Sequence, residues 1–286
     1  MDHDRFVVPQ DGRIRLRDFD TSDTGEFRKK KDAKKKLRTD IARMAALQDV
    51  LYADDRYALL IIFQAMDAAG KDSTIKHVMS GVNPQGCQVF SFKAPSAEEL
   101  DHNYLWRCMK RAPERGRIGI FNRSYYEEVL ITRVHPELLE RQKLPPSARR
   151  NIWEERYAEI NGYERYLVRN GTRVLKFFLH VSRDEQRRRF LRRIDRQEKN
   201  WKFSVGDMNE RAHWDDYQAA YEELINHTST EHAPWHVIPA DHKWFMRGAV
   251  AEIIVHALEG LDLRYPEVDE ERRAELQRIR AELEHD

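Results

Sequence analysis

The sequence predicts an α/β fold, in which a mainly parallel β-sheet carries helices on both faces. Five apolar, strand-like runs alternate with segments of helical pattern, at residues 57–63, 87–92, 117–121, 173–181 and 235–239. Strands that alternate with helices form βαβ units. The first run leads into a loop that ends in Gly70-Lys71. Because right-handed crossovers place ligands beside the carboxyl ends of parallel strands, we expect the functional site there.

The helices between these runs have recognisable ends. Ser96 and Glu99 form a capping-box pattern at the start of a helix that we expect to reach Lys110. Another helix is expected from about residue 147 to residue 170, where a glycine ends it. The last core helix is expected over residues 244–261.

We expect one domain with an addition at each end. Residues 1–50 form an N-terminal arm with a basic helix, whose apolar residues recur at helical spacing and pack on the core. Residues 51–262 form the core, with a lid inserted at about residues 183–227. Residues 263–286 form a charged, helix-prone tail.

The composition excludes several classes of protein. Of 286 residues, 41% are hydrophobic and 35% are charged, and the apolar runs are too short to span a membrane. The N-terminus lacks the pattern of a secretory signal, and the two cysteines fit neither a disulfide framework nor a zinc site. We therefore expect a cytoplasmic protein that is not embedded in a membrane.

The net charge is only +1, but basic residues gather in two blocks, at residues 27–38 and 183–202. Near-neutrality with local basic blocks suggests a surface that binds a polyanion. For one block alone, a solvated helix face is the more common explanation. Two blocks in a chain that also has a phosphate loop favour the polyanion.

The loop AMDAAGKDS resembles the phosphate-binding pattern GxxxxGK[ST]. It keeps Gly70 and Lys71, but Ala65 replaces the first glycine and Asp72 replaces the hydroxyl, a role that we expect Ser73 to take. Amide groups at a helix N-terminus attract phosphate, and a strand before the loop and a helix after it provide that setting. A coincidental turn before a helix is the alternative.

Asp67 is an unexpected carboxylate inside a loop that should attract anions. If the phosphate arrives with Mg²⁺, Asp67 is a suitable oxygen ligand for the metal. The alternative is that Asp67 only hydrogen-bonds the backbone of the loop.

A second polar strand end follows residue 121, where Asn122 and Arg123 precede a helix expected to begin near Ser124 and to end before Pro136. In phosphate-loop kinases this position commonly supplies a metal-binding acid. The amide of Asn122 leaves the site with one negative charge fewer.

The second basic block predicts a lid. At helical spacing Arg188, Arg192, Arg196 and Lys199 share one face, and Phe190, Ile194 and Trp201 lie on the opposite face. We expect the apolar face to anchor the helix, a second helix to return over residues 210–227, and the cations to close over phosphates. A surface helix with internal ion pairs is the alternative.

Five blocks in this order resemble the polyphosphate kinase 2 family of phosphate-loop phosphotransferases over residues 50–262: MDAAGKDSTIKHV, FKAPS, FNRSYYEEVL with RVHPE, RFLRRIDR with KNWKFS, and IPADHKWFMR. The resemblance implies a three-layer α/β/α P-loop NTPase fold, similar to thymidylate kinases, with a helical lid. It also implies reversible, Mg²⁺-dependent transfer of phosphate between inorganic polyphosphate and a nucleotide.

The resemblance also implies roles for single residues. Catalytic roles fall on Asp67, which would also hold the metal, and on Lys71, Asn122, Arg123 and Arg183. Contacts with nucleotide or phosphate fall on Ala68, Ala69, Gly70, Lys71, Asp72, Ser73, Lys76, Lys93, Glu127, Glu128, Arg133, Arg188, Arg192, Arg193, Asp241 and Lys243. Asp241 could instead cap the helix that is expected near Trp244.

The NRSYYEE form resembles the branch of the family that phosphorylates both AMP and ADP, with Glu127 or Glu128 helping to place AMP. The implied partners are polyphosphate and adenine nucleotides, with guanine nucleotides as an option, in a homodimer or homotetramer. An ATP-dependent nucleoside monophosphate kinase is the nearest alternative. A nucleic-acid binder is the other, but no nucleic-acid motif is present, so we expect no nucleic-acid partner.

The residues also fit the chemistry of phosphoryl transfer, which depends on positioning and on positive charge. The second pKa of a nucleotide phosphate is about 6, so the nucleophile is largely ionised at pH 7. A dedicated general base is therefore not needed, and we expect the histidines to be structural.

Overall fold

The computed structural model describes residues 3–10 and 12–285. Its core is a six-stranded sheet in the order β1-β6-β5-β2-β4-β3. The strands are β1 (Val7–Val8), β2 (Ala58–Gln64), β3 (Cys87–Ser91), β4 (Ile118–Asn122), β5 (Thr172–His180) and β6 (Trp235–Pro239). All neighbouring pairs are parallel except β1 with β6, which is antiparallel. The five predicted strands are confirmed, and β1 was not predicted.

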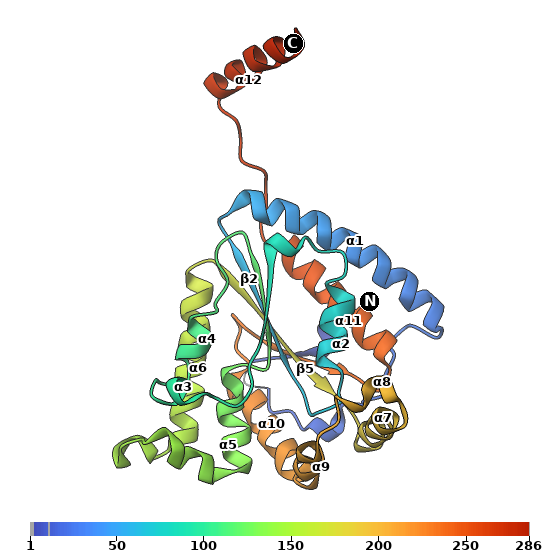
Figure 1. The fold of residues 1–286 in the computed structure, drawn as a ribbon, viewed down its shortest axis with the longest axis vertical. Helices are drawn as coiled ribbons and strands as arrows, with labels where there is room; N and C mark the ends of the chain where they lie inside the picture. Colours follow the sequence, from blue (N-terminus) through green and yellow to red (C-terminus); the bar gives the residue numbers. More distant parts are fainter. Residues whose placement is uncertain (1–2, 11, 286) are drawn as a thin grey trace.

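Helices cover both faces of this sheet, as Figure 1 shows, so the predicted α/β fold is confirmed. The α-helices are α1 (Lys30–Asp54), α2 (Lys71–Val78), α3 (Ala97–Leu100), α4 (Trp106–Met109), α5 (Ile131–Val134), α6 (Ile152–Arg169), α7 (Arg183–Asp195), α8 (Gln197–Asn200), α9 (Val205–Ala212), α10 (Trp214–Thr228), α11 (Lys243–Glu259) and α12 (Glu270–Leu283). The 3₁₀ helices are η1 (Asp4–Phe6), η2 (Leu16–Asp18), η3 (Pro84–Gly86), η4 (Tyr125–Val129), η5 (Pro136–Gln142) and η6 (Pro146–Arg149).

The core lies on both sides of β2, whose seven residues are all buried. On one side α11 packs against β5 and β6, and α1 and α2 pack against α11. Because α11 is covered on both sides, it is apolar around most of its circumference. On the other side α6 packs on β5, and α10 packs on α6. The strand ends that carry the phosphate loop and Asn122 therefore lie side by side, in β2 and β4.

Three predicted helices have different boundaries. The helix expected from about residue 147 begins as α6 only at Ile152, after the separate 3₁₀ helix η6. The helix predicted from Ser96 to Lys110 is two short helices. The side chain of Asn103 accepts hydrogen bonds from the N–H groups of Leu105 and Trp106, and so starts the second helix separately from the first. Its capping box at Ser96 and Glu99 is confirmed. The helix expected near Ser124 begins as η4 and becomes α-helical only at α5.

The N-terminal arm and the C-terminal tail differ in their packing. The helix α1 runs through the predicted boundary at residue 50, and its Met44 and Leu51 are fully buried. In contrast, α12 has no buried residue and stands apart from the body at the end of an extended segment (Figure 1). No helix within residues 3–10 and 12–285 is both long enough and apolar enough to cross a membrane.

Candidate active site

The phosphate loop connects β2 to α2. The chain turns through left-handed backbone at Ala68 (φ 59°) and Gly70 (φ 115°), and α2 begins at Lys71. A side chain at position 70 would be strained, and its Cβ would lie 3.3 Å from the methyl carbon of Met246. Gly70 is therefore required by the backbone, whereas Ala68 adopts a conformation that alanine rarely takes.

Lys71 is buried at the start of α2. Its ammonium donates to the carbonyl oxygens of Ala65 at 2.6 Å and Met66 at 3.4 Å. Burial lowers the pKa of Lys71 to about 8, and the positive charge of Arg123 adds to this effect. Lys71 is thus still largely protonated at pH 7 but more acidic than an exposed lysine.

Asp67 is paired with Arg123 from the end of β4. The Nη2 of Arg123 lies 2.7 Å from the Oδ1 of Asp67, and its Nη1 lies 3.3 Å from the Oε2 of Glu127. The negative charge of Glu127 is the largest cause of a raised pKa for Arg123, with a further contribution from Asp67. The alternative in which Asp67 bonds only to the loop backbone is therefore wrong.

Asn122 is hydrogen-bonded to the other loop carboxylate. Its side-chain amide donates to the Oδ1 of Asp72 at 2.7 Å and to the hydroxyl of Ser91 at 3.4 Å. An aspartate at position 122 would place two carboxylates against each other. The two departures from the usual pattern, Asp72 in the loop and Asn122 at the strand end, are thus complementary.

These residues line a cavity of about 830 Å³ at the carboxyl end of the sheet. Cations from the lid and from α11 form its other wall, namely Arg189, Arg192, Arg193, Lys199, Lys202, Lys243 and Arg247. Arg193 is held by the carboxylate of Asp207 at 3.1 Å. Arginines of the segment predicted as a lid thus line the same cavity as the phosphate loop.

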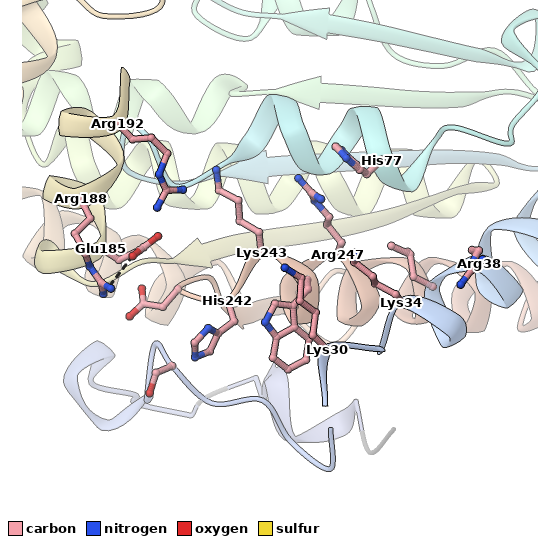
Figure 2. Close-up of a pocket in the computed structure, with 14 residues that line it drawn as sticks. Lys30, Lys34, Arg38, His77, Glu185, Arg188, Arg192, His242, Lys243 and Arg247 are labelled. Atoms are coloured by element: carbon pink, nitrogen blue, oxygen red, sulfur yellow. Dashed lines mark ion pairs between the residues drawn. The ribbon is translucent and has the colours of Figure 1, made fainter. Parts of the chain in front are cut away.

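A basic groove of about 930 Å³ continues from this cavity, and Figure 2 shows its side chains. The two share Arg192, Lys243 and Arg247. The groove then passes between α7, α11 and the N-terminal half of α1, which adds Lys30, Lys34 and Arg38. Burial, with the nearby charges of arginines, lowers the pKa of Lys243 to about 8.

The acidic side chains of the groove are already bonded. Glu185 accepts from Arg189 at 2.8 Å and pairs with Arg188 at 3.2 Å. Asp241 accepts the N–H of Ser182 and the hydroxyl of Thr21, each at 2.8 Å. The residue before α11 is His242, so the alternative in which Asp241 caps that helix is wrong.

A third cavity, of about 230 Å³, opens on the other side of Arg123. Apolar side chains form much of its wall, together with Glu127, Glu128 and Arg107. It shares Phe92, Lys93, Ala94 and Arg123 with the phosphate-loop cavity. A molecule with an apolar ring at one end and phosphates at the other fits this arrangement.

The structure brings most of the predicted site residues to these cavities, but not all. Lys76 is exposed on α2, outside the three cavities. Arg133 pairs with Glu223 and lies over the ring of Trp153, away from the loop. Arg183 is exposed at the start of α7 and lines none of the three.

The predicted lid face is wrong in two respects. The helix α7 ends at Asp195, where Arg196 is extended, so Arg196 and Lys199 do not continue its stripe. Of the predicted apolar anchors only Phe190 is buried, whereas Ile194 is 50% and Trp201 77% exposed. The return segment is also two helices, α9 and α10, with a break at His213.

The sequence analysis missed several residues that the structure places here. Gln186 and Arg189 lie on the buried face of α7 and contact the phosphate loop. Arg247 follows Lys243 by one helical turn on α11, a spacing that could have revealed it. Phe92 and Tyr104 line the third cavity. Phe92 opens the FKAPS block but was not singled out, and Tyr104 lies in none of the five blocks.

The sequence profile of the family "Polyphosphate kinase 2" matches residues 27–266. The chain belongs to the polyphosphate kinase 2 family. The match includes the phosphate loop, the lid, α11 and the basic half of α1. Apart from Ser22, every residue that lines the two basic cavities lies within it.

Two relatives and one solved structure are similar to this chain over nearly their whole length. The ADP-polyphosphate phosphotransferase of Rhodopseudomonas palustris is 51% identical over 281 residues, which cover 98% of this chain and 97% of the relative. The AMP/ADP-polyphosphate phosphotransferase of Meiothermus ruber is 46% identical, over 92% of this chain and 95% of the relative. The crystal structure of polyphosphate kinase 2 from Arthrobacter aurescens TC1 is 40% identical with a TM-score of 0.85, over 96% of this chain and 97% of that one.

Proposed function

We propose that this polyphosphate kinase 2 family member transfers the terminal phosphate of inorganic polyphosphate to ADP and AMP, forming ATP and ADP, in a reversible reaction. The observation that carries the proposal is the continuity of the two basic cavities, which share Arg192, Lys243 and Arg247. A mononucleotide donor would need the phosphate loop but not a groove that extends to Lys30 and Lys34 of α1. This is the ground on which we prefer polyphosphate over ATP as donor.

The donor chain would lie along the groove with its last phosphate at the phosphate loop. Lysine and arginine side chains from three helices face this path (Figure 2). Polyphosphate carries about one negative charge per phosphate, so each cation meets an equivalent partner whatever the register of the chain. The roles of Arg188, Arg192, Arg193 and Lys243 in this binding are part of the proposal.

The acceptor nucleotide would place its base in the third cavity and its phosphates beside Arg123. The shared wall of Phe92, Lys93 and Arg123 supports this orientation, because it joins the apolar cavity to the phosphate loop. Glu127 and Glu128 line the same cavity. The names of the two relatives, one for ADP and one for AMP and ADP, support both acceptors.

Magnesium fits the donor set of the loop. Asp67 and Asp72 supply carboxylate oxygens, the type of ligand that Mg²⁺ prefers, and phosphates and water commonly complete its shell. Within residues 3–10 and 12–285 no group of three or more His, Cys, Asp and Glu residues could hold a metal alone. A bound Mg²⁺ would neutralise charge on the transferred phosphate.

The chain's own residues would supply the rest of the catalysis. Lys71 and Arg123 would stabilise the charge that spreads over the transferred group, and the amides of the loop would hold it in line. The acceptor phosphate is already ionised at pH 7, because its second pKa is about 6, so no side chain needs to remove a proton. We also propose a homodimer or homotetramer in the cytoplasm, which light scattering and fractionation would test.

Product analysis tests the proposal. The protein is incubated with AMP, long-chain polyphosphate and Mg²⁺, without ATP, and nucleotides are separated by chromatography over time. We expect ADP first and ATP afterwards. Formation of ADP without ATP would show that ADP is not an acceptor. No product until ATP is supplied would instead establish an ATP-dependent monophosphate kinase.

A further inference from the structure

Side chains of the lid helix α7 hold three consecutive carbonyl groups of the phosphate loop. The side-chain amide of Gln186 donates to the carbonyl of Asp67 at 2.9 Å. The Nη1 of Arg189 donates to the carbonyls of Ala68 at 3.1 Å and Ala69 at 2.5 Å. Gln186 and Arg189 are 1% and 3% exposed, so these contacts are shielded from water.

The orientation of these carbonyls fixes the orientation of the loop amides. In a trans peptide the C=O and the following N–H point in opposite directions, and the described chain contains no cis peptide. When the carbonyls of residues 67–69 point toward α7, the N–H groups of residues 68–70 point away from it. Ala69 uses its N–H in a turn to Met66. The N–H groups of Ala68 and Gly70, two residues that line the phosphate-loop cavity, stay available for an anion.

Arg189 uses all its hydrogen-bonding capacity in this role. A guanidinium has five N–H donors. One goes to the carboxylate of Glu185 at 2.8 Å, two go to the loop, and the remaining two go to the carbonyls of Ala240 at 2.5 Å and Asp241 at 3.1 Å. Although Arg189 borders the cavity, it has no N–H group left for phosphate. This separates Arg189 from Arg192 and Arg193 on the same helix.

The loop needs such support, because Ala68 is held at φ 59°, where alanine is unfavourable. A strained backbone persists only where its surroundings fix it. The two hydrogen bonds from Gln186 and Arg189 to the carbonyls of residues 67 and 68 lie on either side of that strained residue.

We propose that Gln186 and Arg189 are positioning residues that shape the anion site: they turn the loop carbonyls away from the phosphate and the loop amides toward it. The proposal rests on the proposed function, since it assigns how the phosphate loop of that reaction is held. It also gives α7 two tasks, because the same helix presents Arg192 to the phosphate chain.

The test compares Gln186→Met with a matched control, Arg211→Met. The Oε1 of Gln186 accepts from Arg211 at 2.5 Å, so Gln186→Met removes both the loop contact and the contact with Arg211. Arg211→Met keeps the loop contact and removes the hydrogen bonds from Arg211 to Gln186 and to the carbonyl of Arg183. We expect kcat with ADP and polyphosphate to fall about tenfold in Gln186→Met, with KM for polyphosphate changed less than about threefold. In Arg211→Met we expect kcat within about threefold of the wild type.

A second readout follows the amides themselves. The protein is labelled with ¹⁵N-glycine, and the Gly70 amide signal is recorded while inorganic tripolyphosphate is added. We expect a large shift in the wild type and in Arg211→Met and a clearly smaller one in Gln186→Met. Arg189→Lys should lose more activity, about a hundredfold, because an ammonium has three donors for the five acceptors that Arg189 serves.

The outcomes separate the two proposals. A wild-type protein that gives no turnover with polyphosphate overturns the proposed function. If the wild type is active and Gln186→Met matches Arg211→Met in kcat and in the Gly70 shift, the positioning role is wrong. A lowered melting temperature in Gln186→Met with unchanged kcat and Gly70 shift below that temperature would show a merely structural role.

Discussion

The phosphate-loop cavity and the basic groove adjoin, but their charged side chains are held in different ways. In the cavity Asp67 pairs with Arg123 at 2.7 Å, and Arg123 is held from behind by Glu127 of the third cavity at 3.3 Å. In the groove the side chains of Lys30, Lys34 and Arg38 make no hydrogen bond or ion pair within the described part of the chain. The charges beside the phosphate loop are fixed, whereas the cations that α1 adds to the groove are free.

This difference matches two physical tasks. Charges that stabilise a transition state are most effective when they are oriented beforehand, because the protein then has no reorganisation left to make. Charges that hold a polymer with many equivalent phosphates do not need one geometry, and long flexible side chains can follow any register. We therefore expect substitutions in the cavity to lower kcat and substitutions in the groove to raise KM.

Lys71→Ala should have the largest effect. It removes the buried ammonium at the start of α2, and we expect kcat to fall by about 10³-fold. The fold should be retained, because a desolvated charge costs stability. Turnover measured beside circular dichroism and urea unfolding checks this. Retained turnover would contradict the assignment of the phosphate loop.

Asn122→Asp should have the next largest effect. The new carboxylate would face Asp72, now 2.7 Å from the amide, and we expect kcat to fall about tenfold. The double variant Asn122→Asp/Asp72→Asn restores a donor facing an acceptor and should recover most of the activity. Failure of the double variant to recover would mean that the two positions act separately.

In the groove, Lys30→Gln/Lys34→Gln should raise KM for long polyphosphate about three- to tenfold and leave kcat nearly unchanged. The matched control is Lys31→Gln/Lys35→Gln, on the same helix but outside the groove. The effect should be smaller with tripolyphosphate and should shrink as salt is added. A loss of kcat of the same size would contradict the division between fixed and free charges.

The smallest effect concerns pH. Lys71 and Lys243 have pKa values lowered to about 8, so kcat/KM should decline above about pH 8 as the free enzyme loses these charges. The contribution of these two lysines to the free energy of unfolding changes with pH in the opposite direction to kcat/KM. Between pH 8 and 10.5 the unfolded lysines bind more protons than the folded ones, so their contribution to the free energy of unfolding rises with pH. Measuring kcat/KM across this pH range, with unfolding curves recorded at the same pH values, distinguishes loss of the lysine charges from loss of the fold.

The sequence predicted central strands such as β2 and β4 well, because strands buried on both faces appear as largely apolar runs. It missed β1, which has only two residues, too few for a periodic signal. The lid was predicted poorly for a different reason. Its buried face carries Glu185, Gln186 and Arg189, which are polar and satisfied by hydrogen bonds. A search for apolar periodicity therefore chose the wrong anchors.

The site was predictable where a motif carried it and not where it depended on neighbours in space. Gly70, Lys71, Asn122 and Arg123 could be found from their places at strand ends. The hydrogen bond between Asp72 and Asn122 joins residues that are 50 positions apart in the chain, and only the parallel pairing of β2 with β4 brings them together. The third cavity combines two of the five sequence blocks with side chains such as Tyr104 and Gln142, and only the fold brings these segments together.

The contrast between the chain ends has a practical consequence for handling the protein. The segment near the N-terminus forms β1 on the sheet edge, and Thr21 donates a hydrogen bond to Asp241 beside the groove. The opposite end is carried by α12, which stands clear of the body (Figure 1). Anchoring to a solid support through the C-terminus would therefore leave the sheet edge and the mouth of the groove open, whereas a bulky fusion at the N-terminus would be attached only a few residues before β1 on the sheet edge.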